Sequence, residues 1–146
     1  MEKLLKELNS FARLFDKDLK IIFGNEYEYN PKTKEITITL DFIEEDEKIF
    51  EVVKDIFKPD FTFGIFSLFI LHEIGHCMTL ENAKQHKDYC VIKRGLYSCI
   101  DDFDTRYRMM FTLIEEKMAT DFAINWLSDN SAVMNQWLDI FDKAVS

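Results

Sequence analysis

The sequence predicts an α+β fold in which a small N-terminal antiparallel sheet precedes a helical part. Strand-like alternation of apolar and polar residues is confined to residues 1–40, and helical periodicity dominates from residue 44 onward. The composition favours one packed core, because 47% of the 146 residues are hydrophobic and only 4 are Gly and 2 are Pro. We therefore expect a single domain spanning residues 1–146, in which a sheet and its helices are segregated.

The N-terminal part predicts one helix followed by three strands. Apolar residues recur at three- and four-residue spacing over residues 2–16, which indicates an amphipathic helix. Residues 19–23 form a short strand that ends at Gly24. Residues 27–29 and 36–40 alternate on either side of an Asn-Pro turn, so they predict a β-hairpin.

Helices account for the remainder of the chain. Residues 44–58 carry an apolar stripe that ends before a proline. A second helix, from residue 60 or 62 to about residue 80, is apolar on nearly every side, so we expect it at the centre of the core. Residues 81–100 show no clear period and predict a long loop with a short element. A long helix from residue 104 or 105 to 127, and a last helix over 132–141, complete the prediction.

Charge and cysteine content narrow the range of partners and compartments. The chain has 18 Lys and Arg against 27 Asp and Glu, a formal net charge of −9, which repels nucleic acid and anionic lipid. Its three cysteines have no disulfide-framework spacing, which argues against a secreted domain. The longest apolar run, residues 61–71, is too short to span a bilayer. We expect a cytoplasmic protein that binds neither nucleic acid directly nor a membrane.

One motif, His72-Glu73-Ile74-Gly75-His76, carries the chemistry. The two histidines are four residues apart on the predicted helix, so both imidazoles project from one face and can reach one tetrahedral Zn²⁺. Glu73 lies at the edge of this face, where its carboxylate can take a proton from a water at the metal. Gly75 costs about 1 kcal/mol relative to Ala inside a helix, which suggests close approach of another backbone or of a substrate.

A catalytic zinc site needs a third protein ligand. The metzincin spacing is absent, because Thr79 and Asn82 stand where that class has Gly and His. Glu116 aligns with small residues on the inward face of the helix over 104–127, and a buried carboxylate is costly without a cation opposite it. We predict Glu116 as the third ligand, with Glu115 as its main rival. The weaker alternatives are His86, Asp101, Asp102 and Asp104.

The motif at 72–76 and the segment Glu116-Lys117-Met118-Ala119-Thr120-Asp121-Phe122-Ala123 resemble the ImmA/IrrE family of zinc metallopeptidases. That family pairs a His-Glu-x-Gly-His helix with a later Glu-x-x-Ala-Asn/Asp-x-Phe-Ala helix, and residues 20–128 follow its order of elements. The resemblance implies a gluzincin-type, zincin-like fold with His72, His76 and Glu116 as zinc ligands. It also implies Glu73 as the catalytic base. Position 120 carries Thr where the family usually has Asn or Asp.

These residues predict a zinc-dependent metalloendopeptidase that hydrolyses peptide bonds of a protein or peptide substrate, bound as an added strand along residues 36–40. The resemblance implies a phage or mobile-element protein whose substrate is a helix-turn-helix repressor. The alternative function is a catalytically weak or inactive zincin-fold protein that binds and sequesters a partner; Thr120 motivates it, and so does an unassigned oxyanion donor. A purely structural zinc domain is less favoured, because it leaves Glu73 without a role. The candidates for the oxyanion donor are Tyr89, Tyr97, Arg106 and Tyr107.

Overall fold

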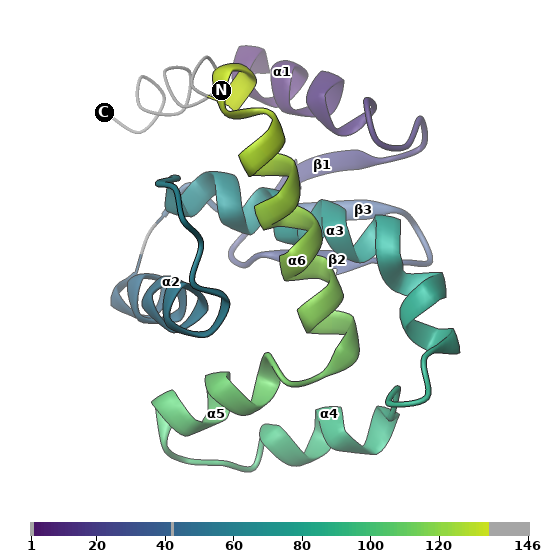
Figure 1. The fold of residues 1–146 in the computed structure, drawn as a ribbon. Coiled ribbons are helices and arrows are strands. Elements are labelled where there is room, and N and C mark those ends of the chain that lie inside the picture. Colours follow the sequence, from purple (N-terminus) through teal and green to yellow (C-terminus); the bar gives the residue numbers. More distant parts are fainter. Residues whose placement is uncertain (1, 42, 135–146) are drawn as a thin grey trace.

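The computed structural model describes residues 2–41 and 43–134 and confirms an α+β fold that is mostly helical (Figure 1). Its elements are α1 (Glu2–Ala12), β1 (Lys20–Phe23), β2 (Glu28–Asn30), β3 (Glu35–Ile38), α2 (Glu44–Phe57), α3 (Ile65–Gln85), α4 (Val91–Tyr97), α5 (Phe103–Met110) and α6 (Ile114–Asp129). The predicted helix over 132–141 lies largely outside the described residues. No helix in the described part of the chain combines the length and apolar character that a membrane crossing requires.

The three strands form a mixed sheet in the order β1-β3-β2. β2 and β3 pair antiparallel, which confirms the predicted hairpin. β1 runs parallel to β3, so the prediction of an antiparallel sheet is wrong. Because β2 occupies one side of β3 in the hairpin, β1 pairs with the other side of β3. There it runs parallel to β3. Alternation within each strand does not encode this choice of side.

The two edges of the sheet differ in how they are covered. The side-chain amide of Asn9 on α1 pairs with the backbone of Ile21, accepting from its N–H at 2.8 Å and donating to its carbonyl at 3.1 Å. This contact satisfies the outward-facing backbone groups of β1 at Ile21. β2 has β3 as its one strand neighbour among the described residues, so its other edge pairs with no strand that the structure describes. β3 is the central strand, and the expected strand addition along residues 36–40 is therefore wrong.

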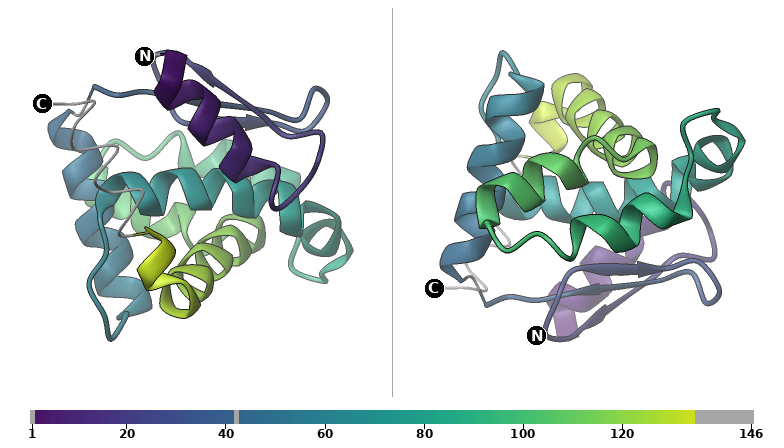
Figure 2. Two further views of the ribbon diagram at one scale, coloured as in Figure 1. Left: turned by 90° about the horizontal axis from the view of Figure 1, so that it is seen from above. Right: turned by 90° about the horizontal axis from the view of Figure 1, so that it is seen from below.

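α3 is the central helix, as predicted. It packs against β2 and β3 on one side and most extensively against α6 on the other (Figures 1 and 2). Ile70, Leu71 and Ile74 on α3 are at most 2% exposed. The helix begins at Ile65, later than predicted, and residues 58–64 before it are not helical. There the Phe63 ring packs edge-on against Phe50 of α2 at a centroid distance of 5.7 Å.

The long helix predicted over 104–127 is broken into two. Residues 111–113 form a turn in which Phe111 and Leu113 are both buried. The break lets α5 pack against α2 while α6 packs against α3. The predicted loop over 81–100 also contains more helix than expected, because α3 continues to Gln85 and α4 follows.

Candidate metal centre

The motif histidines project from the same face of α3, as their spacing predicts. The rings of His72 and His76 stack edge to face with centroids 4.6 Å apart, and both side chains are about 15% exposed. Donor atoms of His72, Glu73 and His76 lie within 4.8 Å of one another. Two imidazoles and a carboxylate at this separation can hold a metal ion.

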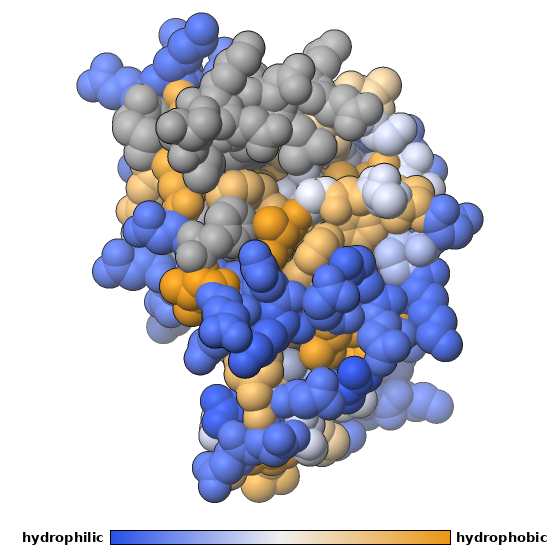
Figure 3. All heavy atoms as spheres, turned by 90° about the vertical axis from the view of Figure 1, so that its left-hand side faces the viewer, coloured by the Kyte–Doolittle hydropathy of each residue, from blue (hydrophilic) through white to orange (hydrophobic). Residues whose placement is uncertain are grey.

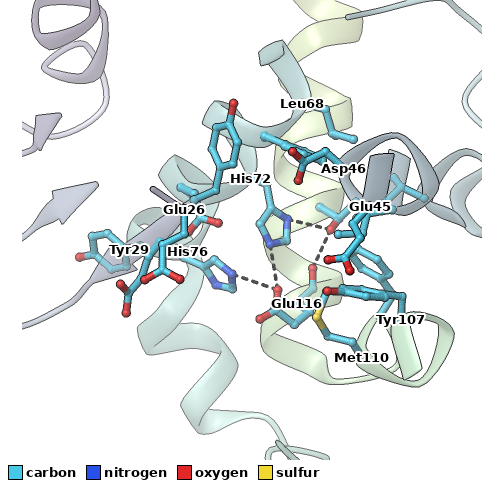
Figure 4. Close-up of a pocket in the computed structure, with 18 of the residues that line it drawn as sticks. Glu26, Tyr29, Glu45, Asp46, Leu68, His72, His76, Tyr107, Met110 and Glu116 are labelled. Carbon is cyan, nitrogen blue, oxygen red and sulfur yellow. Dashed lines mark hydrogen bonds and ion pairs between the residues drawn. The ribbon is translucent and has the colours of Figure 1, made fainter. Parts of the chain in front are cut away.

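Glu116 reaches the same point from α6. Its Oε2 atom lies 2.8 Å from Nε2 of His72 and 3.0 Å from Nε2 of His76 (Figure 4). Donors on a tetrahedral zinc ion are about 3.3 Å apart, so each histidine nitrogen needs to move only a few tenths of an ångström from the Glu116 oxygen to share a zinc ion with it. The side chains that the sequence predicts as ligands therefore converge in the fold.

Thr120, one turn after Glu116, fixes the orientation of His72. The Thr120 hydroxyl donates to the carbonyl oxygen of Glu116 at 2.9 Å, and its oxygen lies 3.0 Å from Nδ1 of His72. Because the hydroxyl proton is engaged, Nδ1 of His72 must donate to Thr120. When Nδ1 donates to Thr120, a neutral His72 ring presents the lone pair of Nε2 to a bound metal, as a metal ligand requires. Thr120 therefore supports a histidine that the sequence predicts as a metal ligand.

Gly75 allows α6 to approach α3 this closely. A Cβ atom built on Gly75 would lie 2.5 Å from the carbonyl oxygen and 3.0 Å from Cα of Ala119. Both are backbone atoms of α6, so a side chain at position 75 would push the two helices apart. Gly75 and Ala119 therefore set the separation between the histidines on α3 and Glu116 on α6.

Charge and burial shift the pKa values of the site residues. Burial raises the pKa of Glu116, but hydrogen bonds from His72 and His76 outweigh this effect and hold the pKa far below its usual range. Burial also lowers the pKa of His76, but the Glu116 hydrogen bond and charge raise it to a net value above 6.5. In the metal-free protein the site therefore favours a Glu116 carboxylate paired with a protonated His76 imidazole. A bound metal cation would take the place of the positive charge that this proton carries.

Glu73 differs from Glu116 in its contacts. It is 8% exposed, and its carboxylate forms no hydrogen bond to any residue that the structure describes. Burial raises the pKa of its carboxyl, and the nearby His72 and His76 partly oppose that shift. A carboxyl group whose pKa is raised by burial, beside two imidazoles, is the kind of group that can accept and return a proton.

A cavity of about 770 Å³ is lined by the side chains of His72, Glu73, His76 and Glu116. Tyr97 of α4 and Tyr107 of α5 also line it, whereas Tyr89 and Arg106 do not. Arg106 instead donates to the carbonyl of Ile100 at 2.7 Å. Burial raises the pKa of both Tyr97 and Tyr107, so each remains an O–H donor facing the cavity.

The rival ligands lie elsewhere. Glu115 is buried, and its Oε1 pairs with Arg94 at 3.1 Å. His86 terminates α3, where Nδ1 accepts from the N–H of Asp88. Asp102 caps α5, and Asp104 pairs with Arg108. Neither these residues nor Asp101 line the cavity.

Sequence reasoning missed two contributors to the site, Thr120 as a contact and Arg94 as a lining residue. Arg94 comes from the segment predicted as loop, and it lines the cavity while pairing with Glu115. The signal available was Glu115 itself, because a carboxylate on an inward helix face needs a partner.

Comparisons with protein-family models, with curated protein sequences and with solved structures found no match for this chain.

Proposed function

We propose that the protein is a zinc metalloendopeptidase of the ImmA/IrrE type, with His72, His76 and Glu116 as ligands of Zn²⁺. The single observation that carries this proposal is the convergence of both imidazole Nε2 atoms on one oxygen of Glu116, at 2.8 and 3.0 Å. These residues are 40 and 44 positions apart in the chain, so the fold has brought them together. Two nitrogens and one carboxylate oxygen suit zinc better than calcium or magnesium.

In this proposal Glu73 acts as the catalytic base. When bound, zinc would supply Lewis acidity that activates a water and polarises a peptide carbonyl. Glu73 takes a proton from the attacking water and returns it to the departing amine, which its buried position and lack of a hydrogen-bond partner permit. The hydroxyls of Tyr97 and Tyr107 are available to donate to the carbonyl oxygen as negative charge develops there.

The substrate in this proposal is an extended segment of a protein. The resemblance implies that this protein is a repressor of the helix-turn-helix type. The edge of β2 that pairs with no described strand supports such binding, because Tyr27, Glu28 and Tyr29 line the cavity beside the metal ligands. A peptide can add to this edge as a further strand. The proposed strand is β2 rather than the central β3.

Metal analysis tests the zinc centre. Protein purified without chelator should contain about one zinc per chain, and His72→Ala and Glu116→Ala should each lower this content markedly. His86→Ala, which removes the one histidine outside the motif, should leave it unchanged. Absence of zinc in the purified protein, with none taken up on titration, would end the proposal.

The alternative is a zincin-type protein that binds and sequesters a partner without cleaving it. The Thr120 contact to His72 weakens one reason for that alternative, because the histidine does have a supporting partner. The two proposals differ in the role of Glu73, which matters for hydrolysis and not for sequestration.

A further inference from the structure

We propose that the segment bound in this cavity is cationic, rich in Lys and Arg; this inference rests on the proposed peptidase function and names its substrate class. Five carboxylates stand on the two walls of the cavity. The β2 side contributes Glu26 and Glu28, and the α2 side contributes Asp41, Glu45 and Asp46. Figure 4 shows Glu26 on one side of the two histidines, with Glu45 and Asp46 on the other.

The wall carboxylates lack the cations that accompany other acids on the same helix. On α2, Glu44 pairs with Lys48, Glu51 with Lys54, and Asp55 with Arg108. Among the described residues, none of the five wall carboxylates forms an ion pair. Hydrophilic side chains cover much of the α2 side of the molecule (Figure 3). The three ion pairs of α2 involve none of the residues that line the cavity, whereas the five wall carboxylates have no such partner.

Helix capping explains only part of this charge. Asp46 accepts from the N–H of Ile43 at 3.1 Å and so stabilises the start of α2. Glu26, Glu28 and Asp41 lie outside any helix, so the helix dipole gives no reason for acids at these positions.

The floor of the cavity adds an independent observation. Glu73 is more than nine-tenths buried and lines the cavity, and its carboxylate has no hydrogen-bond partner among the described residues. Of the lysines and arginines that the structure describes, Arg94 alone lines the cavity, and Glu115 already neutralises it. The carboxylates of the two walls thus have no neutralising lysine or arginine among the described residues of the cavity, which favours a cationic ligand.

Aromatic rings between the carboxylates suit lysine and arginine side chains in particular. Tyr27 and Tyr29 accompany Glu26 and Glu28 on one wall, and Tyr107 faces the α2 wall. A long cationic side chain can lay its methylene stem on a tyrosine ring and present its charge to a carboxylate. Low-dielectric walls of one charge also concentrate a cationic ligand in the cavity, and salt weakens this effect.

Binding of two labelled peptides tests the inference. The peptides are about ten residues long and share their apolar positions, one with lysines and the other with glutamates at the remaining positions. Fluorescence anisotropy is measured in the zinc-loaded Glu73→Gln protein, so that cleavage does not interfere. We expect the lysine peptide to bind at least tenfold more tightly, and its affinity to fall as salt rises from 50 to 300 mM.

Two matched triple variants separate the walls from the overall charge. The first is Glu26→Gln/Glu28→Gln/Glu45→Gln, and the second is Glu44→Gln/Glu47→Gln/Glu51→Gln on the outer side of α2; each removes three charges from exposed positions. The wall variant should weaken binding of the lysine peptide at least tenfold, and the outer variant less than twofold. The single change Glu45→Lys should weaken it too, even if the triple variant folds poorly.

The inference is overturned if the lysine peptide does not bind measurably, if the two peptides bind equally, or if the outer variant matches the wall variant. The same titration on metal-free His72→Ala protein separates this result from the fate of the proposed function. If zinc never binds but the lysine preference persists, only the peptidase proposal fails. If one zinc binds but the peptides bind equally, only the cationic-substrate inference fails.

Discussion

The Thr120 hydroxyl accepts a hydrogen bond from Nδ1 of His72 at 3.0 Å while donating its own proton to the carbonyl of Glu116. This relationship sets the tautomer of the neutral His72 ring and keeps the lone pair of Nε2 available to a metal. Removing the hydroxyl should therefore weaken metal binding without disturbing the ligands themselves. Supporting contacts of this kind change metal affinity by roughly 10- to 100-fold.

Thr120→Val removes the hydroxyl at nearly constant volume. We expect a zinc affinity lower by about 10- to 100-fold, measured by competition with a chromophoric chelator. Thr79→Val is the matched control, because the Thr79 hydroxyl on α3 donates only to the carbonyl of Gly75. An equal loss of zinc affinity in both variants would argue against a specific role for Thr120.

Gly75→Ala should separate α3 from α6. The new Cβ would meet the Ala119 carbonyl oxygen at 2.5 Å, so we expect a loss of about 1–3 kcal/mol in the free energy of unfolding together with weaker zinc binding. Helix propensity alone predicts a gain of about 1 kcal/mol. Gly95→Ala on α4 is the control, because its Cβ would meet nothing within 4 Å, and there the gain should appear. Denaturant unfolding of both variants decides between packing and propensity.

Glu115 and Glu116 should behave oppositely when changed to Gln. Glu116→Gln should lose zinc, because it replaces the carboxylate that lies beside both imidazoles and is the proposed third metal ligand. Glu115→Gln should keep zinc and lower the free energy of unfolding, because it removes the negative charge that a buried side chain pairs with the half-exposed Arg94. Zinc content and chemical unfolding of the two variants provide the measurement. Loss of zinc from Glu115→Gln with retention in Glu116→Gln would reverse the ligand assignment.

The metal-free protein should show a pH optimum of stability that depends on Glu116. Its lowered pKa adds stability above its ordinary value of 4.5, and this stability is lost as the pH falls toward the folded pKa. The raised pKa of His76 adds stability below its ordinary value of 6.5, and this stability is lost as the pH rises through the folded pKa. The contribution of the pair is therefore largest between pH 4.5 and 6.5.

The measurement is the difference in unfolding free energy between the unsubstituted protein and Glu116→Gln, in chelator, from pH 4 to 9. We expect this difference to decline above pH 6.5 as His76 loses its proton. Zinc affinity should rise over the same range, because zinc and protons compete for the imidazoles. A difference that grows steadily to pH 9 would contradict the ion-pair account.

Local patterns predicted most of the elements and the residues of the site. The i, i+4 spacing of His72 and His76, and the inward position of Glu116, depend only on helix geometry and on the cost of burying charge. The structure places these three side chains in contact. The reason suggested for Gly75 is also confirmed, because a second backbone does lie against it.

Other features depend on tertiary contacts that the sequence does not display. The side of β3 on which β1 joins is one example, and the break between α5 and α6 is another, because it arises from burying Phe111 and Leu113 in a turn. Arg94 was missed because α4 buries none of its residues and therefore shows no apolar period.

The role of Glu73 tests the account most directly. Cells expressing the unsubstituted protein or Glu73→Gln are compared by mapping new protein N-termini, and the zinc content of both proteins is measured. The account predicts about one zinc per chain in each and a cleavage product that the Glu73→Gln protein forms roughly 10²- to 10⁴-fold more slowly. Glu73→Gln protein that keeps its zinc and cleaves as fast as the unsubstituted protein, or that retains its full biological effect without cleavage, would contradict it.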